Sequence, residues 1–146
     1  EIGSQAFENT SSLVSVSIPN AVKIQNRAFY NGKKIKELNL DHVKEIETEA
    51  FYQCNALTAL NVPKVLKIGE KAFYGSNNLK ELQLPATLET LGDSAFAVEQ
   101  KNRRKLNVNS SRGHTGEKQS VCVCSEFNAD CTGRGSGSVC QCRALG

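Results

Sequence analysis

Hydrophobic residues recur at a fixed spacing along the first two-thirds of the chain. The pair Ala-Phe occurs at residues 6–7, 28–29, 50–51, 72–73 and 95–96, so successive pairs lie 22, 22, 22 and 23 residues apart. An aliphatic residue stands four positions before each of these alanines. A repeat of this length is typical of a solenoid, in which each repeat buries its apolar side against the next.

A second pattern, L-x-x-L-x-L, follows each of the first four pairs. Aliphatic residues occupy its inward positions over residues 13–18, 35–40, 57–62 and 79–84. The alternation at its end suits a short strand with one buried face. Pro19, Pro63 and Pro85 follow three of these segments, with Asp41 in the second. Because proline lacks a backbone N–H, strand pairing should stop there. We predict one strand per repeat and a turn or short helical piece at each Ala-Phe pair.

These patterns predict the fold class. It is an α/β solenoid, a right-handed leucine-rich-repeat array with a parallel sheet on one face, followed by a small Cys-rich irregular tail. The pattern returns in weakened form at Leu106 and Val108, as expected of a degenerate last coil that caps the array. We therefore predict about four coils plus this last one over residues 1–108, and a tail over 109–146. Because residue 1 falls inside a coil, further repeats are expected upstream. No apolar stretch approaches the ~20 residues of a membrane span, so we expect none in this fragment.

The repeat resembles that of the BspA-type leucine-rich repeat family. The matching segments read IGSQAFENTSSLVSVSIP, IQNRAFYNGKKIKELNL, IETEAFYQCNALTALNVP and IGEKAFYGSNNLKELQLP. The resemblance covers about residues 1–98. It implies a surface adhesin or ligand-binding array, with no enzymatic activity.

Polar residues at the outward positions of the strands form columns, with one residue from each repeat. These columns predict a ligand-binding sheet face made of Ser17, Glu37, Asn39, Asn61, Glu81 and Gln83. The alternative interpretation is a merely solvated face. The columns mix lysine with glutamate, which disfavours nucleic acid as a partner and suits a protein ligand. Such a ligand would be an extracellular matrix or cell-surface protein.

Charge and cysteine content divide the chain near residue 100. Residues 1–100 carry 10 Lys/Arg and 12 Asp/Glu, net −2, whereas residues 101–146 carry 8 and 3, net +5. The tail is too poor in aliphatic residues to form a core of its own, so we expect it to need disulfides or a metal, or else to stay flexible. The disulfide candidates are Cys122, Cys124, Cys131, Cys140 and Cys142. Their odd number would require a partner for the fifth.

Two interpretations of the tail stay open. The stretch from Cys122 to Cys142 resembles the N-terminal module of epithelial cell adhesion molecule, which implies disulfides and an extracellular or cell-surface location. The alternative is an intracellular repeat scaffold whose tail binds zinc through these cysteines, because residues 114–118 imitate a zinc-finger linker. Asn9 and Asn109 begin Asn-x-Ser/Thr sequences and are glycosylation candidates, which favours secretion.

The remaining residues with reactive side chains do not indicate catalysis. Cys54 occupies a column of small residues and is expected to be a buried thiol, since no histidine is placed to activate it. His42 follows the second predicted strand and should be solvated. The sequence therefore predicts a non-catalytic protein-binding module that needs no cofactor or metal.

Overall fold

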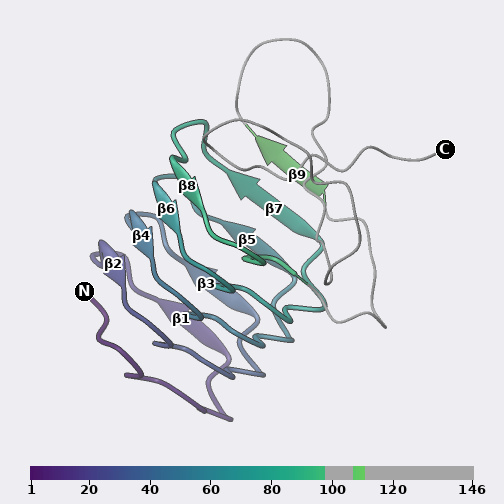
Figure 1. Ribbon diagram of the computed structural model, residues 1–146. Helices are drawn as coiled ribbons and strands as arrows, with labels where there is room; N and C mark the ends of the chain where they lie inside the picture. Colours follow the sequence, from purple (N-terminus) through teal and green to yellow (C-terminus); the bar gives the residue numbers. More distant parts are fainter. Residues whose placement is uncertain (98–106, 111–146) are drawn as a thin grey trace, which may run out of the picture.

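The computed structural model describes residues 1–97 and the backbone of residues 107–110. Within these residues the chain forms strands and turns and no helix, so the Ala-Phe segments are turns. The chain winds into coils that stack on one another, with parallel strands pairing between neighbouring coils (Figure 1). The predicted solenoid of stacked coils with parallel strands is confirmed.

The predicted L-x-x-L-x-L segments form the longer strands of each coil. These are β1 (Ser15–Ser17), β3 (Glu37–Asn39), β5 (Ala59–Asn61), β7 (Glu81–Leu84) and β9 (Asn107–Ser110). They follow one another in a single file along the solenoid (Figure 1). Strand β1 pairs with β3, and β5 pairs with β7, which in turn pairs with β9. The file is interrupted between β3 and β5, which lie side by side without ladder hydrogen bonds.

The weakened last repeat also takes its expected place. Val108 of β9 is in register with Leu82 of β7, so the column of inward aliphatic residues continues into this coil. Strand β9 runs across the boundary predicted between residues 108 and 109. The division into a solenoid and a tail therefore stays a prediction, as do the disulfide and zinc interpretations, because all five tail cysteines lie outside the described residues.

A second file of strands, which the sequence analysis did not predict, lies beside the first. It consists of β2 (Lys23–Ile24), β4 (Glu45–Ile46), β6 (Lys67–Ile68) and β8 (Thr90–Leu91), all paired in parallel (Figure 1). The aliphatic residues four positions before the alanines form its inward column, which consists of buried Ile24, Ile46 and Ile68 and partly buried Leu91. Each two-residue strand is too short to show a period of two in the sequence.

A file of phenylalanines runs through the core, where it packs with the inward aliphatic residues of the strands. The rings of Phe7, Phe29, Phe51, Phe73 and Phe96 stack in sequence, with centroids 5.0 to 5.2 Å apart and planes within 6° of parallel. The spacing is close to the ~4.8 Å separation of paired strands, so the pitch of the coils sets the separation of the rings. The expectation that the phenylalanines fill the interior is confirmed for Phe29, Phe51, Phe73 and Phe96, whereas Phe7, at the end of the file, is 41% exposed.

Each Ala-Phe turn is also bonded to the turn of the next coil. The N–H of Phe29 donates to the carbonyl of Ala50 at 2.8 Å, and the N–H of Phe51 donates to that of Ala72 at 2.7 Å. The residue before each alanine has a positive φ between 51° and 58°. These residues are Gln5, Arg27, Glu49, Lys71 and Ser94. None of them is glycine, so the positive φ costs free energy in each turn. The hydrogen bonds between coils offset this cost.

Candidate functional site

The predicted ligand-binding residues lie together on one surface. We define the sheet face as the exposed side of β1, β3, β5 and β7. All six predicted residues are exposed on it: Ser17, Glu37, Asn39, Asn61, Glu81 and Gln83. Register brings them into columns, since Ser17 pairs with Asn39 and Asn61 pairs with Gln83. The inward residues between them are aliphatic and largely buried, as Leu60 and Leu82 show.

The charged groups of the sheet face have no ionic partner among the described residues. Glu37 and Glu81, and the lysines Lys36 and Lys80 that precede them, are exposed and take part in no salt bridge within residues 1–97. The N–H groups of Lys36 and Lys80 donate to the carbonyls of Val14 and Thr58, both at 2.8 Å, which fixes only their backbones. The described part of the chain therefore leaves these four side chains without an ionic partner.

Asn39 differs from the other amides of its column. Its Oδ1 accepts a hydrogen bond from the N–H of Asp41 at 3.4 Å, which closes the turn after β3. Asp41 is the residue that replaces the proline of the other repeats, so this bond provides a local turn where proline is missing. This side chain is consequently engaged by its own coil.

We define the second face as the exposed side of β2, β4, β6 and β8. Unlike the sheet face, it has charged side chains that pair with one another. There Lys23 Nζ lies 3.3 Å from Glu45 Oε2 and 2.7 Å from Glu47 Oε1. The hydrogen bond that Lys23 donates to Glu47, followed by the one that it donates to Glu45, raises the pKa of Lys23 above its ordinary value. Lys23, Glu45 and Glu47 are thus satisfied within the molecule, whereas Lys67 of β6 is exposed and takes part in no salt bridge within residues 1–97.

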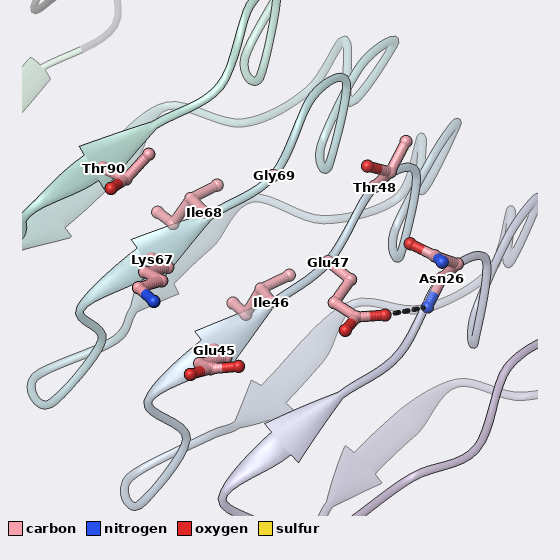
Figure 2. Close-up of a pocket in the computed structure, with 9 residues that line it drawn as sticks. All are labelled: Asn26, Glu45, Ile46, Glu47, Thr48, Lys67, Ile68, Gly69 and Thr90. Carbon is pink, nitrogen blue, oxygen red and sulfur yellow. Dashed lines mark hydrogen bonds between the residues drawn. The ribbon is translucent and has the colours of Figure 1, made fainter.

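A shallow pocket of about 420 Å³ opens on the second face. Figure 2 shows the residues that line it: Asn26, Glu45, Ile46, Glu47, Thr48, Lys67, Ile68, Gly69 and Thr90. Both of its carboxylates bind Lys23, and Glu47 also accepts the backbone N–H of Asn26 at 3.1 Å. Because both carboxylates are already engaged, the pocket offers a cationic ligand less than the sheet face does.

A file of tyrosines runs along the outer side of the Ala-Phe turns. The rings of Tyr30, Tyr52 and Tyr74 stack with centroids 4.8 and 5.1 Å apart, and all three side chains are half-buried. Partial burial raises the pKa of Tyr52 above its ordinary value. The sequence analysis missed this file, although the dipeptide Phe-Tyr recurs every 22 residues and could have indicated it.

Arg27 ends the tyrosine file. Its guanidinium carbon lies 4.2 Å from the centre of the Tyr30 ring, where a cation is attracted to the ring face. The same guanidinium is 2.7 Å from a carboxylate oxygen of Glu8 and 3.6 Å from one of Glu49. These two glutamates belong to the coils on either side of Arg27, so one arginine links three successive coils.

The reactive side chains occupy the positions expected from the sequence. Cys54 is fully buried, and burial raises the pKa of its thiol to about 12. Its Sγ lies 3.6 Å from the carbonyl oxygen of Phe29. His42 is exposed in the turn after β3. A thiol that stays protonated at neutral pH is a poor nucleophile, so Cys54 acts as a packing residue.

The two glycosylation candidates lie in different settings. Asn9 is exposed in the first Ala-Phe turn, and its Oδ1 accepts a hydrogen bond from Asn31 Nδ2 at 2.9 Å. Asn109 lies in β9, in register with Gln83. Glycosylation at either position stays a prediction.

The residues that the structure describes offer no metal site and no membrane-spanning helix. They contain no group of three or more His, Cys, Asp or Glu side chains that could hold a metal ion. The same residues include no helix with the length and apolar character needed to cross a membrane.

Solved structures share the stacked-coil fold. A leucine-rich repeat protein from T. pallidum is 29% identical with a TM-score of 0.61, over 64% of this chain and 45% of that protein. One from Bacteroides ovatus is 26% identical with a TM-score of 0.60, over 71% of this chain and 33% of that protein. A leucine-rich cell surface protein from Faecalibacterium prausnitzii is 24% identical with a TM-score of 0.50, over 75% of this chain and 36% of that protein. The chain thus spans less than half the length of each.

Comparisons of sequence identify the family. A search of curated proteins found no significant match. The model of the BspA-type leucine-rich repeat region matches residues 1–118 with six copies. This match covers most of the chain and includes every repeat that the structure describes. The chain belongs to the BspA-type leucine-rich repeat family.

Proposed function

We propose that the chain is a non-catalytic protein-binding module of a surface or secreted adhesin-like protein. It binds an extracellular matrix or cell-surface protein through the sheet face. The observation that carries this proposal is the contrast between the two faces. Salt bridges satisfy Lys23, Glu45 and Glu47 on the second face, whereas Glu37 and Glu81 on the sheet face have no ionic partner among the described residues.

The shape of the sheet face also suits a protein ligand. Strands with a largely buried inner side hold their outward side chains in fixed columns, so little order has to be gained on binding. Amide groups such as those of Asn61 and Gln83 can both donate and accept hydrogen bonds. A mixture of neutral amides with charges of both signs matches the surface of a protein better than it matches a polyanion.

A paired substitution on the full-length chain tests this proposal. Asn61→Arg places a long side chain over the sheet face, and Thr90→Arg places the same side chain on an exposed position of β8 in the second face. Each variant is immobilised and exposed to a panel of purified matrix and cell-surface proteins. We expect a ligand that binds the natural chain and the Thr90→Arg variant but is lost with Asn61→Arg. Equal retention by both variants would refute binding through the sheet face.

A further inference from the structure

The sheet face has a neutral gap between two charged repeats. Glu37 in β3 and Glu81 in β7 are exposed glutamates at the same outward position of their strands. The residue at that position in the strand between them is Ala59, which is in register with Glu81. The repeat of Ala59 also has Thr58 where its two neighbours have lysine. A small, uncharged repeat therefore separates two carboxylates.

The spacing of these carboxylates fits a single cation. Because β5 lies between β3 and β7, the two glutamates belong to coils that are two repeats apart. The phenylalanine rings of successive coils lie 5.1 Å apart here, so the backbones of the two glutamates are separated by ~10 Å. The alanine methyl group leaves the space above it open. The long glutamate side chains can approach a group placed there from both sides.

The molecule itself fills such a gap elsewhere. Arg27 lies between Glu8 of the preceding coil and Glu49 of the following coil, at 2.7 and 3.6 Å from their carboxylates. On the second face, Lys23 also joins two glutamates, and both of these belong to the following coil. Around Ala59 the two flanking carboxylates, those of Glu37 and Glu81, are present. No arginine or lysine of the described residues binds them.

We propose that the sheet face binds a protein segment that places an arginine side chain over Ala59, between the carboxylates of Glu37 and Glu81. This inference rests on the proposed function and names the chemistry of the ligand. Charge complementarity selects a cation, and the planar guanidinium can donate to two carboxylates at once. Lys36 and Lys80 stand beside the glutamates and repel a purely basic ligand, so the segment also carries acidic residues next to its arginine.

The probe for this site is N-acetyl-arginine-N-methylamide, titrated into the isotope-labelled full-length chain and followed by NMR. The control probe is the citrulline compound, which has nearly the same shape and no charge. We expect saturable shifts centred on Thr58, Ala59 and Asn61 for the arginine probe, with several-fold weaker shifts for citrulline. Equal responses to the two probes, or shifts with no centre at Ala59, would overturn the proposal without any variant being needed.

Substitutions then locate the carboxylates. Exposed ion pairs are each worth up to about 1 kcal/mol, so Glu37→Gln or Glu81→Gln should weaken arginine binding about two- to fivefold. The matched control Glu89→Gln removes an exposed carboxylate away from the sheet face and should leave binding unchanged. Ala59→Arg supplies the cation from the chain itself and should abolish the response. Unchanged binding in Glu37→Gln, Glu81→Gln and Ala59→Arg would refute the site.

Failure of this inference can be distinguished from failure of the proposed function. If a natural ligand is lost with Asn61→Arg but unaffected by Glu37→Gln and Glu81→Gln, the sheet face binds protein without the arginine contact. If the natural ligand still binds all three of these variants, both the proposed function and the arginine contact are refuted.

Discussion

The phenyl rings of Phe51 and Phe73 lie 5.1 Å apart at their centroids, with their planes inclined by only 6°. Each ring belongs to a different coil, and both are fully buried. Their contact is therefore a contact between neighbouring repeats. A solenoid of this kind gains its stability chiefly from such interfaces, because one coil cannot bury its own apolar side.

The first prediction concerns this file of rings. Phe51→Ala should lower the free energy of unfolding by about 3–5 kcal/mol, because it leaves a cavity between two coils. Phe7→Ala is the matched control, since Phe7 ends the file and is 41% exposed. That substitution should cost about 1–2 kcal/mol, in line with its smaller buried area. Urea unfolding followed by circular dichroism measures both. Equal losses would contradict the role of the stack as an interface.

The sheet face should tolerate substitution, in contrast to the core. Asn61 is exposed, and its side chain makes no hydrogen bond with the described residues. Asn61→Ala should therefore change the free energy of unfolding by no more than about 0.5 kcal/mol. The same urea titration checks this. An unfolded Asn61→Ala variant would mean that the inward and outward positions of β5 have been exchanged.

How far the sequence predicts this molecule depends on whether a feature repeats along the chain. The positions of Phe51, Leu60 and Asn61 could be inferred because each belongs to a column that recurs in every coil. The salt bridges of Arg27 depend on side-chain conformation across three coils, and no spacing reveals them. Likewise, no spacing reveals that Glu37 and Glu81 lack ionic partners among the described residues, because this too depends on side-chain conformation.

A third prediction concerns the close approach of neighbouring coils at Gly69. A Cβ atom added there would lie 2.6 Å from the backbone carbonyl carbon of Glu47 and from the backbone nitrogen of Thr48. Because backbone cannot move aside as a flexible side chain can, Gly69→Ala should cost about 1–3 kcal/mol. Gly3 occupies the same position in the first coil and has no atom within 4 Å of such a Cβ. Gly3→Ala should thus be neutral within about 0.5 kcal/mol. Thermal unfolding of the two variants compares them, and equal melting temperatures would contradict the packing argument.

The last prediction is a loss of stability at alkaline pH that depends on Cys54. Burial raises the pKa of this thiol from 9.0 to about 12. Below pH 9 the thiol is protonated in both the folded and the unfolded chain, so it adds no pH dependence. Between pH 9 and 12 the unfolded chain loses this proton and the folded chain keeps it. Stability therefore falls as the pH rises through this range.

The measurement is urea unfolding at pH 8.5 and pH 10 in the presence of a reductant. Since each pKa unit corresponds to 1.36 kcal/mol, Cys54 should contribute a loss of about 1 kcal/mol between these two values. The Cys54→Ala variant should lose correspondingly less over the same interval, even if it is less stable at both. The raised pKa of Tyr52 contributes equally to the two proteins and cancels in the comparison. Identical losses in the natural chain and the variant would show that the thiol is not held protonated by the fold.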